Sequence, residues 1–196
     1  MTDSLHGTAA ASGRPKEGAA PSGGSAVREA TSVGARVWKL GADINTDLLA
    51  PGHAMKHGID KIATYCLESL RPEFASRVRP GDVIVAGPNF GIGSSREQAA
   101  AVLVKLGVAA VIAPSFSGLY FRNAFNVGLL LLTCPEADLL QEAEQVQLDT
   151  ENLAVISAAG KRLACEPIPD FLLDMVRSGG LMNQLRIRFG KEPEHV

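Results

Sequence analysis

Residues 82–113 read DVIVAGPNFGIGSSREQAAAVLVKLGVAAVIA. The apolar run at residues 82–86 predicts a buried strand, and residues 94–106 have the spacing of a helix that stops at Gly107. Residues 108–113 predict a second strand. A strand, a helix and a second strand joined by short loops form a unit whose two strands are parallel. This stretch therefore predicts an α/β fold.

The alternation continues on both sides of this stretch. Residues 36–40 predict a short strand upstream, residues 117–126 predict a second helix, and residues 129–133 predict a further parallel strand. Residues 60–77 have helical spacing interrupted at Pro72, which indicates a helical hairpin outside the sheet. We therefore expect a mostly parallel sheet with flanking helices.

The C-terminal third of the chain predicts a different layer. Residues 146–150 and 153–157 are two strand-like runs separated by two residues, which favours a tight β-hairpin. Residues 170–177 predict a helix that ends at a pair of glycines. A small β layer should therefore flank the parallel sheet, with one helix after it.

The composition indicates one folded domain with tails. The chain has 196 residues, of which 46% are hydrophobic, enough to bury one substantial core. Residues 1–33 are rich in Ala, Gly, Ser and Pro, so we expect a disordered N-terminal tail. The folded domain is expected at residues 34–190, and residues 191–196 are expected to form a C-terminal tail.

Charge and hydropathy argue against several classes of partner. The 19 basic and 21 acidic residues leave no positive excess for nucleic acid. No apolar run reaches the ~18 residues needed to cross a membrane. The wide spacing of Cys66, Cys134 and Cys165 fits neither a disulfide framework nor a metal site. We expect no metal on this chain, no nucleic acid or membrane partner, and a cytoplasmic location in which thiols stay reduced.

The residues that carry chemistry follow the first strand of the opening stretch. The loop at residues 88–98 lies at the carboxyl end of a parallel strand, where open α/β sheets bind ligands. Gly91 and Gly93 allow a ligand to approach the backbone, and the start of a helix offers free N–H groups to an anion. Arg96 supplies a fork of donors for a carboxylate. The loop therefore has the parts of a small-anion site.

A purely structural interpretation accounts for part of the same loop. Ser94 and Ser95 can each cap a helix, with Glu97 or Gln98 completing a capping box. Capping alone requires neither the glycines nor the arginine. The loop is not a dinucleotide fingerprint, a P-loop or a hydrolase elbow, because the residues that define those motifs are missing.

Three motifs resemble those of the aconitase swivel-domain family. Residues 89–97, NFGIGSSRE, resemble the family's Gly-Ser-Ser-Arg-Glu signature. Residues 43–47, DINTD, are similar to its Asp-x-x-Thr-Asp motif, and residues 115–129 are similar to its Ser-Phe and Arg-Asn stretch. Together with residues 179–182, their spacing resembles that of free-standing small subunits of isopropylmalate dehydratases over residues 36–188. The implied fold is the aconitase-like swivel domain.

The resemblance implies a hydro-lyase small subunit that is active only with a large subunit, which holds a four-iron four-sulfur cluster. This chain would hold no cofactor itself. Ser94 would be the base that takes the proton beside a substrate carboxylate, and Gly93, Ser95 and Arg96 would bind the substrate. The substrate would be a hydroxy di- or tricarboxylic acid, with 3-isopropylmalate and 2-isopropylmalate of leucine biosynthesis as the first candidates.

The resemblance also implies a specificity loop and a set of supporting residues. The specificity loop is His53, Ala54, Met55, Lys56 and His57. The supporting residues are Asp43, Thr46, Asp47, Glu97, Arg122 and Asn123.

The sequence of the specificity loop leaves the substrate open. It differs from the Tyr-Leu-Arg-Thr or Tyr-Leu-Val-Tyr sequence of isopropylmalate enzymes, so methylmalate, dimethylmalate, citramalate and homocitrate types remain candidate substrates. Two alternatives of other classes are a non-catalytic carboxylate-binding module, which would not need Ser94, and a serine hydrolase. A hydrolase would need His53 or His57 near Ser94.

Overall fold

Four parallel strands form the centre of the structure, a computed structural model that describes residues 34–190. They are β1 (Ala35–Lys39), β2 (Val83–Val85), β3 (Ala110–Ala113) and β4 (Leu130–Thr133), in the order β4-β3-β2-β1. Every residue of β2 and β3 is buried, which explains why their sequences are continuous apolar runs. The predicted α/β fold with a mostly parallel sheet is confirmed. The tails predicted at residues 1–33 and 191–196 lie outside the described residues.

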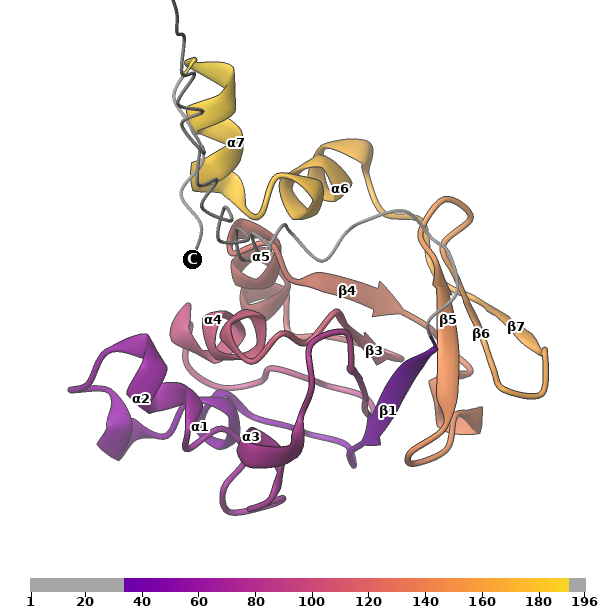
Figure 1. Ribbon diagram of the computed structural model, residues 1–196, viewed down its shortest axis with the longest axis horizontal. Coiled ribbons are helices and arrows are strands. Elements are labelled where there is room, and N and C mark those ends of the chain that lie inside the picture. The colour runs from indigo at the N-terminus through magenta and orange to yellow at the C-terminus, as the bar shows by residue number, and fades with distance from the viewer. Residues whose placement is uncertain (1–33, 191–196) are drawn as a thin grey trace, which may run out of the picture.

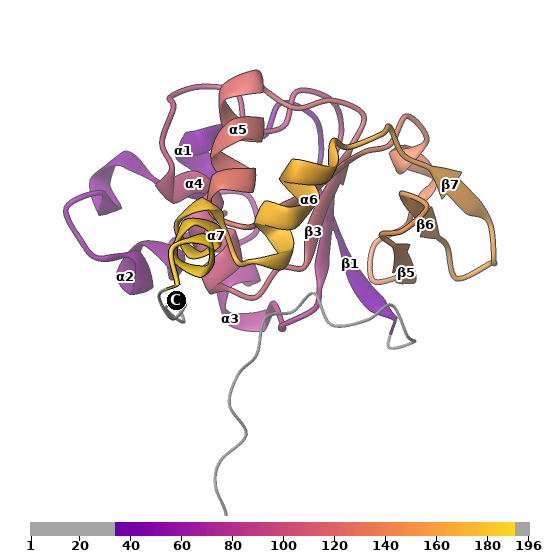
Figure 2. The ribbon, with the colours of Figure 1, turned by 90° about the horizontal axis from the view of Figure 1, so that it is seen from above.

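Helices gather on one side of the parallel strands (Figure 2). They are α1 (Thr46–Leu49), α2 (Ile59–Ala63), α3 (Phe74–Arg77), α4 (Gln98–Lys105) and α5 (Gly118–Asn126), with 3-10 turns at Gly52–Ala54 and Ala137–Leu139. The predicted hairpin at residues 60–77 contains less helix than expected. Its first helix ends at Ala63 and turns follow, in which Leu67 has a φ of 59° that is incompatible with a continuing α-helix.

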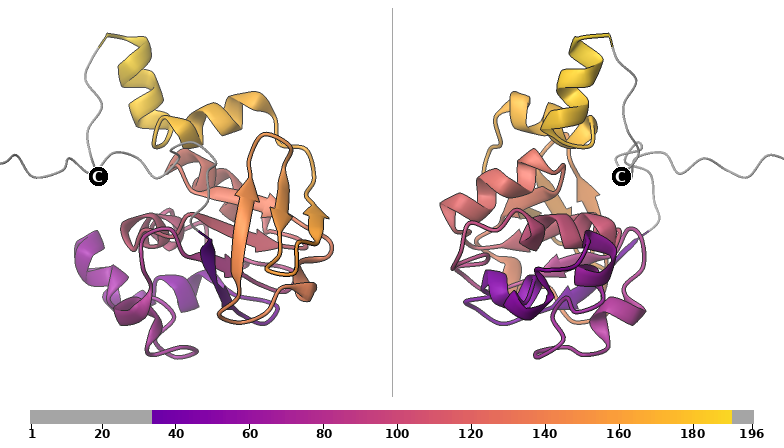
Figure 3. Two further views of the ribbon diagram at one scale, coloured as in Figure 1. Left: turned by 45° about the vertical axis from the view of Figure 1, so that its right-hand side comes forward. Right: turned by 90° about the vertical axis from the view of Figure 1, so that its left-hand side faces the viewer.

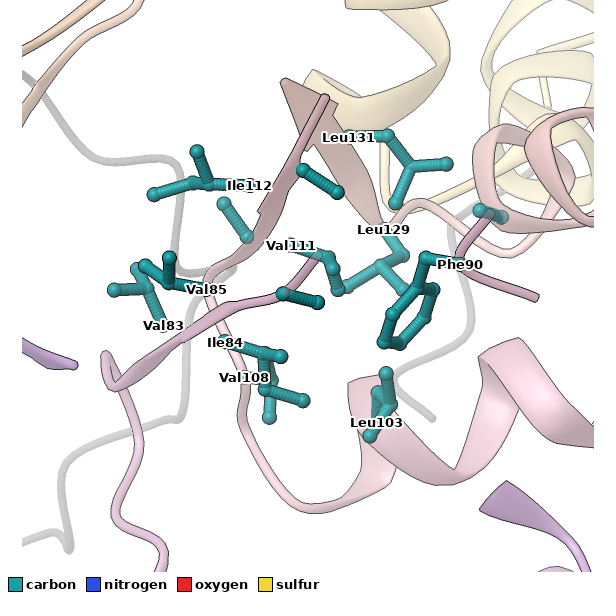
Figure 4. Close-up of a cluster of buried hydrophobic side chains, with 14 of the residues drawn as sticks. Val83, Ile84, Val85, Phe90, Leu103, Val108, Val111, Ile112, Leu129 and Leu131 are labelled. Atoms are coloured by element: carbon teal, nitrogen blue, oxygen red, sulfur yellow. The ribbon is translucent and has the colours of Figure 1, made fainter. Parts of the chain in front are cut away.

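The core packs the parallel strands against the helices and includes Phe90, from the loop that follows β2. Figure 4 shows the ring of Phe90 close to Leu103 of α4, Leu129 and Val111 of β3. All four side chains are almost fully buried. Burial of a side chain of this size stabilises a fold by roughly 1.5–3 kcal/mol. Phe90 therefore anchors the loop that follows β2 in the core.

The small β layer continues the parallel sheet instead of lying apart from it. It consists of β5 (Gln145–Asp149), β6 (Ala154–Ile156) and β7 (Arg162–Ala164). The predicted hairpin is confirmed as the antiparallel pair β5 and β6, whereas β7 was not predicted. Because β5 also pairs with β1, the full order is β4-β3-β2-β1-β5-β6-β7 (Figure 3, left).

The chain ends in two helices that differ in how well the sequence predicts them. Helix α6 (Asp170–Arg177) has its predicted bounds and ends where the amide of Gly180 donates to the carbonyl of Met175 at 2.7 Å. Helix α7 (Leu181–Arg188) was not predicted, because its apolar residues do not gather on one face. It projects from the rest of the fold (Figure 1). None of the helices in the described part of the chain is long and apolar enough to cross a membrane.

Candidate active site

Two loops from elsewhere in the chain hold the signature loop, residues 88–97, in place. On one side, the amide of Gly91 donates to the carbonyl of Ile44 at 2.6 Å, and the amide of Thr46 donates to the carbonyl of Ile92 at 2.8 Å. These bonds pair the signature loop with the loop before α1 as a short parallel bridge. Two of the three motifs of the sequence therefore meet in space.

The loop after β3 supports the signature loop from the other side. The amide of Asn89 donates to the hydroxyl of Ser115 at 2.9 Å. The Asn89 side chain donates to the carboxylate of Asp43, also at 2.9 Å. Asn89 has a φ of 62°, which Asn tolerates better than most residues. Asp43 thus contacts the signature loop, and so does Ser115, which the sequence interpretation did not include.

Gly91 packs directly on the ring of Tyr120 in α5. Gly91 has a φ of 80°, and a Cβ atom at this position would lie 2.1 Å from Cγ of Tyr120. The Tyr120 ring is buried and meets the Phe90 ring edge-on at 5.3 Å between centroids. Burial raises the pKa of the Tyr120 hydroxyl well above its ordinary value, so this group stays neutral. Gly91 is therefore required for close packing against Tyr120, and the approach of a ligand at this glycine stays a prediction.

Gly93 is exposed, and the side chain of Thr46 packs against its inner face. Its φ is 110°, and a Cβ atom here would lie 2.9 Å from the hydroxyl oxygen of Thr46. Thr46 is buried, and its hydroxyl has no hydrogen-bond partner among the described residues. A side chain at Gly93 would be strained and would displace this hydroxyl. The backbone at Gly93 is thus open to a ligand only on its outer face.

The two serines of the signature are exposed and do not cap a helix. Helix α4 begins only at Gln98, Glu97 occupies its N-cap position, and no side chain caps it. The amide of Arg96 donates to the carbonyl of Ser94 at 2.8 Å in a turn before the helix. The predicted helix start at Ser94 and the predicted capping box are therefore wrong, because the positive φ of Gly93 and this turn delay the helix. Both serine hydroxyls lack a hydrogen bond within the described residues.

The guanidinium of Arg96 is held in position by the segment around α1. Its Nη1 atom donates to the carboxylate of Asp47 and to the carbonyl of Ala50 at 2.8 Å. The Arg96 side chain is 23% exposed. Within the described part of the chain, its Nε and Nη2 atoms make no hydrogen bond. A carboxylate can accept two parallel hydrogen bonds from a guanidinium, so the free Nε and Nη2 atoms of Arg96 can bind one carboxylate.

Helix α5 contributes the remaining residues beside the signature loop. The Asn123 side chain donates to the carbonyl of Ser95 at 3.1 Å. Arg122 is exposed, and no hydrogen bond or ion pair involves its side chain among residues 34–190. The structure thus brings Asn123 to the signature loop and leaves the charge of Arg122 unneutralised.

The predicted specificity loop divides into buried and exposed residues. Ala54 is fully buried, and Met55 is half-buried and packs against the core. The Nε2 atom of His53 lies 3.3 Å from the carboxylate of Glu68. Lys56 and His57 are exposed and form no ion pair with a described residue. Of the five, His53, Lys56 and His57 have exposed side chains.

The cysteines do not gather around a metal position. Cys66 follows α2, Cys134 follows β4, and Cys165 follows β7, and all three are free thiols. Within residues 34–190, no group of three or more His, Cys, Asp or Glu side chains is arranged to hold a metal ion. These donors do not fit the coordination of an iron–sulfur cluster, which uses several clustered thiolates.

Comparison with known proteins shows which chains this one resembles. Residues 70–137 match the aconitase C-terminal domain family. The 3-isopropylmalate dehydratase small subunit 1 of Thermotoga maritima is 40% identical over 154 residues, which cover 77% of this chain and 93% of that protein. The homoaconitase small subunit of Thermus thermophilus is 42% identical over 161 residues, which cover 81% and 98%.

A solved structure agrees. The crystal structure of 3-isopropylmalate dehydratase from Methanocaldococcus jannaschii superposes with a TM-score of 0.75 and 35% identity, over 79% of this chain and 93% of that one. The chain therefore belongs to the aconitase-related family of hydro-lyase small subunits that includes those of 3-isopropylmalate dehydratase and homoaconitase.

Proposed function

We propose that this chain is the small subunit of an enzyme that interconverts 3-isopropylmalate and 2-isopropylmalate, a dehydration and rehydration in leucine biosynthesis. The observation that carries the proposal is the pairing, on one loop, of an exposed Ser94 hydroxyl and an Arg96 fork held by Asp47. The names of relatives at about 40% identity support the choice of acid. A cytoplasmic location is part of the same proposal.

Ser94 would act as the base that removes a proton from the carbon beside a substrate carboxylate. Its hydroxyl is free for this work because it caps no helix. A serine hydroxyl is a weak base near neutral pH, so its deprotonated form needs nearby positive charge. Arg96, two residues along the same loop, supplies that charge. The N-terminus of α4 contributes less than the sequence implies, because the helix begins four residues after Ser94.

Arg96 and Ser95 would hold a carboxylate of the substrate. The unused Nε and Nη2 atoms of Arg96 suit a bidentate bond to a carboxylate. Asp47 and Ala50 fix the direction of the guanidinium by occupying Nη1. Asn123 fixes the backbone at Ser95. The charge of Arg122, on the next helix, is available to a second acidic group of the substrate or to an acidic group of the partner.

The proposed enzyme needs a second subunit. An iron–sulfur cluster on a large partner subunit would supply the Lewis acid that withdraws the substrate hydroxyl. The cysteines of this chain do not fit such a cluster, which supports its placement on the partner. The exposed signature loop would then face that subunit and enclose the substrate between the two chains, so that water is excluded from the reacting carbon.

A tricarboxylic acid is the second candidate substrate. Lys56 is exposed on the specificity loop, and its ammonium would favour a further carboxylate over an apolar isopropyl group. Two relatives at 41% and 42% identity are named homoaconitase small subunits. A serine hydrolase is disfavoured, since neither His53 nor His57 forms a hydrogen bond with the Ser94 hydroxyl among the described residues. A binding-only module leaves the free Ser94 hydroxyl without a purpose.

The test is reconstitution with the large subunit of such an enzyme, followed by a hydratase assay over isopropylmalate, methylmalate, citramalate and homocitrate. We expect turnover by the complex and none by the isolated small chain. Turnover by the isolated chain, or a cluster-containing complex that acts on none of these acids, would contradict the proposal. A complex carrying Ser94→Ala serves as the matched inactive control.

A further inference from the structure

The two edges of the curled sheet meet at a pair of cysteines. The amide of Glu166, just after β7, donates to the carbonyl of Thr133, the last residue of β4, at 2.8 Å. Between antiparallel strands, an amide-to-carbonyl bond of this kind lies next to two directly opposed residues that share no backbone hydrogen bond with each other. That opposed pair is Cys134 and Cys165. Such residues have Cα atoms about 4.5 Å apart and side chains on the same face.

The side chains are consistent with this backbone arrangement. The Cys165 thiol donates to the sulfur of Cys134, which lowers the pKa of the Cys134 thiol against the opposing effect of burial. The same bond, together with burial, raises the pKa of the Cys165 thiol. A disulfide requires Cα atoms separated by roughly 4.4–6.8 Å, so an opposed pair meets the requirement with little movement. Cys134 is buried, whereas Cys165 is partly exposed. A small reagent can therefore approach the pair from the Cys165 side.

We propose that Cys134 and Cys165 form a reversible disulfide on reaction with a low-molecular-weight disulfide such as oxidised glutathione. One thiolate of the pair attacks one sulfur of the reagent, forms a mixed disulfide and releases one reagent thiolate. The thiolate of the other cysteine then attacks the protein sulfur of this mixed disulfide and releases the second. The two protein thiols are oxidised, the reagent disulfide is reduced to two thiols, and the two cysteine protons pass to the released thiolates.

The third cysteine provides an internal comparison. Cys66 is buried, and burial raises the pKa of its thiol. A buried thiol is out of reach of a dissolved reagent, whereas the pair is open to one on the Cys165 side. No cysteine lies opposite Cys66 within the described residues. The structure therefore predicts reaction at one pair and protection of the remaining thiol.

The bond would fasten one edge of the sheet to the other. The layer β5 to β7 joins the parallel strands through only two paired positions of β1 and β5, Ala35 with Val146 and Arg36 with Gln145. A disulfide between the ends of β4 and β7 adds a covalent link on the opposite side and closes a loop of roughly 30 residues. Oxidation should therefore stabilise the folded chain without touching the signature loop.

The experiment uses the purified full chain, incubated with mixtures of oxidised and reduced glutathione, quenched with acid and alkylated. Trypsin separates the two cysteines into the peptides 123–161 and 163–177, so the disulfide appears as one linked pair. We expect this linked pair, loss of two alkylation sites, and reversal by dithiothreitol. The melting temperature should rise by about 5 °C or more on oxidation.

Three variants make the test specific. Cys66→Ser should oxidise as the wild type does, and Cys165→Ser should show neither the linked peptides nor the rise in melting temperature. Since Cys165 is partly exposed, this variant should keep the wild-type circular dichroism spectrum, whereas Cys134→Ser alone could fail by unfolding. Persistent glutathione adducts without linked peptides, or links that involve Cys66, would overturn the proposal. Linked peptides without a rise in melting temperature would contradict the stabilising role.

Discussion

The guanidinium of Arg96 donates to the carboxylate of Asp47, 49 positions earlier in the chain. The pair joins the signature loop to α1, which leads directly into the specificity loop. Asp47 is largely exposed, so the ion pair adds little to folding. Its main effect is to direct the free donors of Arg96.

The first prediction concerns this pair. Asp47→Asn should lower kcat/KM of the reconstituted complex by about 10-fold or more, chiefly through KM. The reason is that the Arg96 guanidinium, which would bind the substrate carboxylate, loses the ion pair that holds it in position. The free energy of unfolding should change by less than about 1 kcal/mol. The control is Asp60→Asn, which removes an exposed ion pair with Lys105 away from the site. An unchanged KM in Asp47→Asn would show that Arg96 is positioned by other contacts.

The second prediction separates catalysis from capping. Ser94→Ala should lower kcat by ~10²-fold or more while the unfolding free energy stays within about 0.5 kcal/mol of wild type, since the hydroxyl has no structural bond to lose. Steady-state kinetics and urea titration measure the two effects. Ser76→Ala, an exposed serine on α3, is the control and should leave kcat unchanged. Activity within a few-fold of wild type in Ser94→Ala would exclude Ser94 as the base.

The third prediction concerns the packing beneath the loop. Gly91→Ala should destabilise the chain by about 2 kcal/mol or more, because it combines an unfavourable φ with a collision against the Tyr120 ring. Gly118→Ala, where a Cβ meets nothing within 4 Å, should be neutral or slightly stabilising. Urea unfolding of both variants gives the comparison. Equal stability of the two would mean that the ring moves aside freely.

The fourth prediction concerns pH. Burial of Asp82 favours its neutral form, but bonds from Arg36, Trp38 and the Arg79 amide outweigh this and lower the pKa of Asp82. A lowered folded-state pKa means that the stabilisation is complete above the unfolded value of ~3.9 and is lost as pH falls below it.

The corresponding variant is Asp82→Asn. It should be less stable by about 2 kcal/mol at pH 7 and should depend less steeply on pH between 5 and 2 than the wild type. Unfolding titrations across this range provide the measurement. The exposed Asp174→Asn on α6 is the control and should retain the wild-type slope. If the stability of Asp82→Asn falls with pH as steeply as that of the wild type, a group other than Asp82 causes the acid sensitivity.

The fifth prediction concerns the choice of acid. If Lys56 faces the substrate, the complex should accept a broader range of hydroxy acids than a strict isopropylmalate enzyme, and Lys56→Val should shift kcat/KM toward isopropylmalate by about 10-fold. The hydratase assay over the panel of hydroxy acids gives kcat/KM for each acid in the wild type and in the variant. A wild-type complex confined to isopropylmalate by more than ~10³-fold would refute the idea. Lys61→Val, on α2, controls for loss of surface charge.

The sequence predicts most of the fold because its signals are local. Continuous apolar runs predict β2, β3 and β4, and apolar spacing followed by two glycines predicts the bounds of α6. The start of α4 was misjudged because Ser94 and Glu97 satisfy the pattern of a capping box, while the positive φ of Gly93 decides the actual geometry. Helix α7 was missed because it lacks an apolar face.

The site was predictable as a set of motifs but not as an arrangement. Ser94 and Arg96 stand out by residue type. The roles of Ser115 and Tyr120 depend on contacts between distant segments, which no local pattern encodes. Asn89 carried one usable signal, since Asn before a Gly-rich loop often adopts positive φ. The burial of Ala54 likewise follows from packing around α1 and not from its neighbours in sequence.

The site is built from parts that evolution can change separately. Ser94 and Arg96 lie on one segment, and Lys56 and His57 lie on another. Backbone bonds between residues 91–92 and residues 44–46, and the bonds of the Arg96 guanidinium to Asp47 and Ala50, link the first segment to α1, which precedes the second. Substitutions at the exposed Lys56 and His57 should therefore leave the segment of Ser94 and Arg96 and its supports unaltered. We expect that exchange of these two surface residues can change the preferred hydroxy acid while the proposed reaction chemistry is kept, which fits relatives of similar identity that carry the names of different acids.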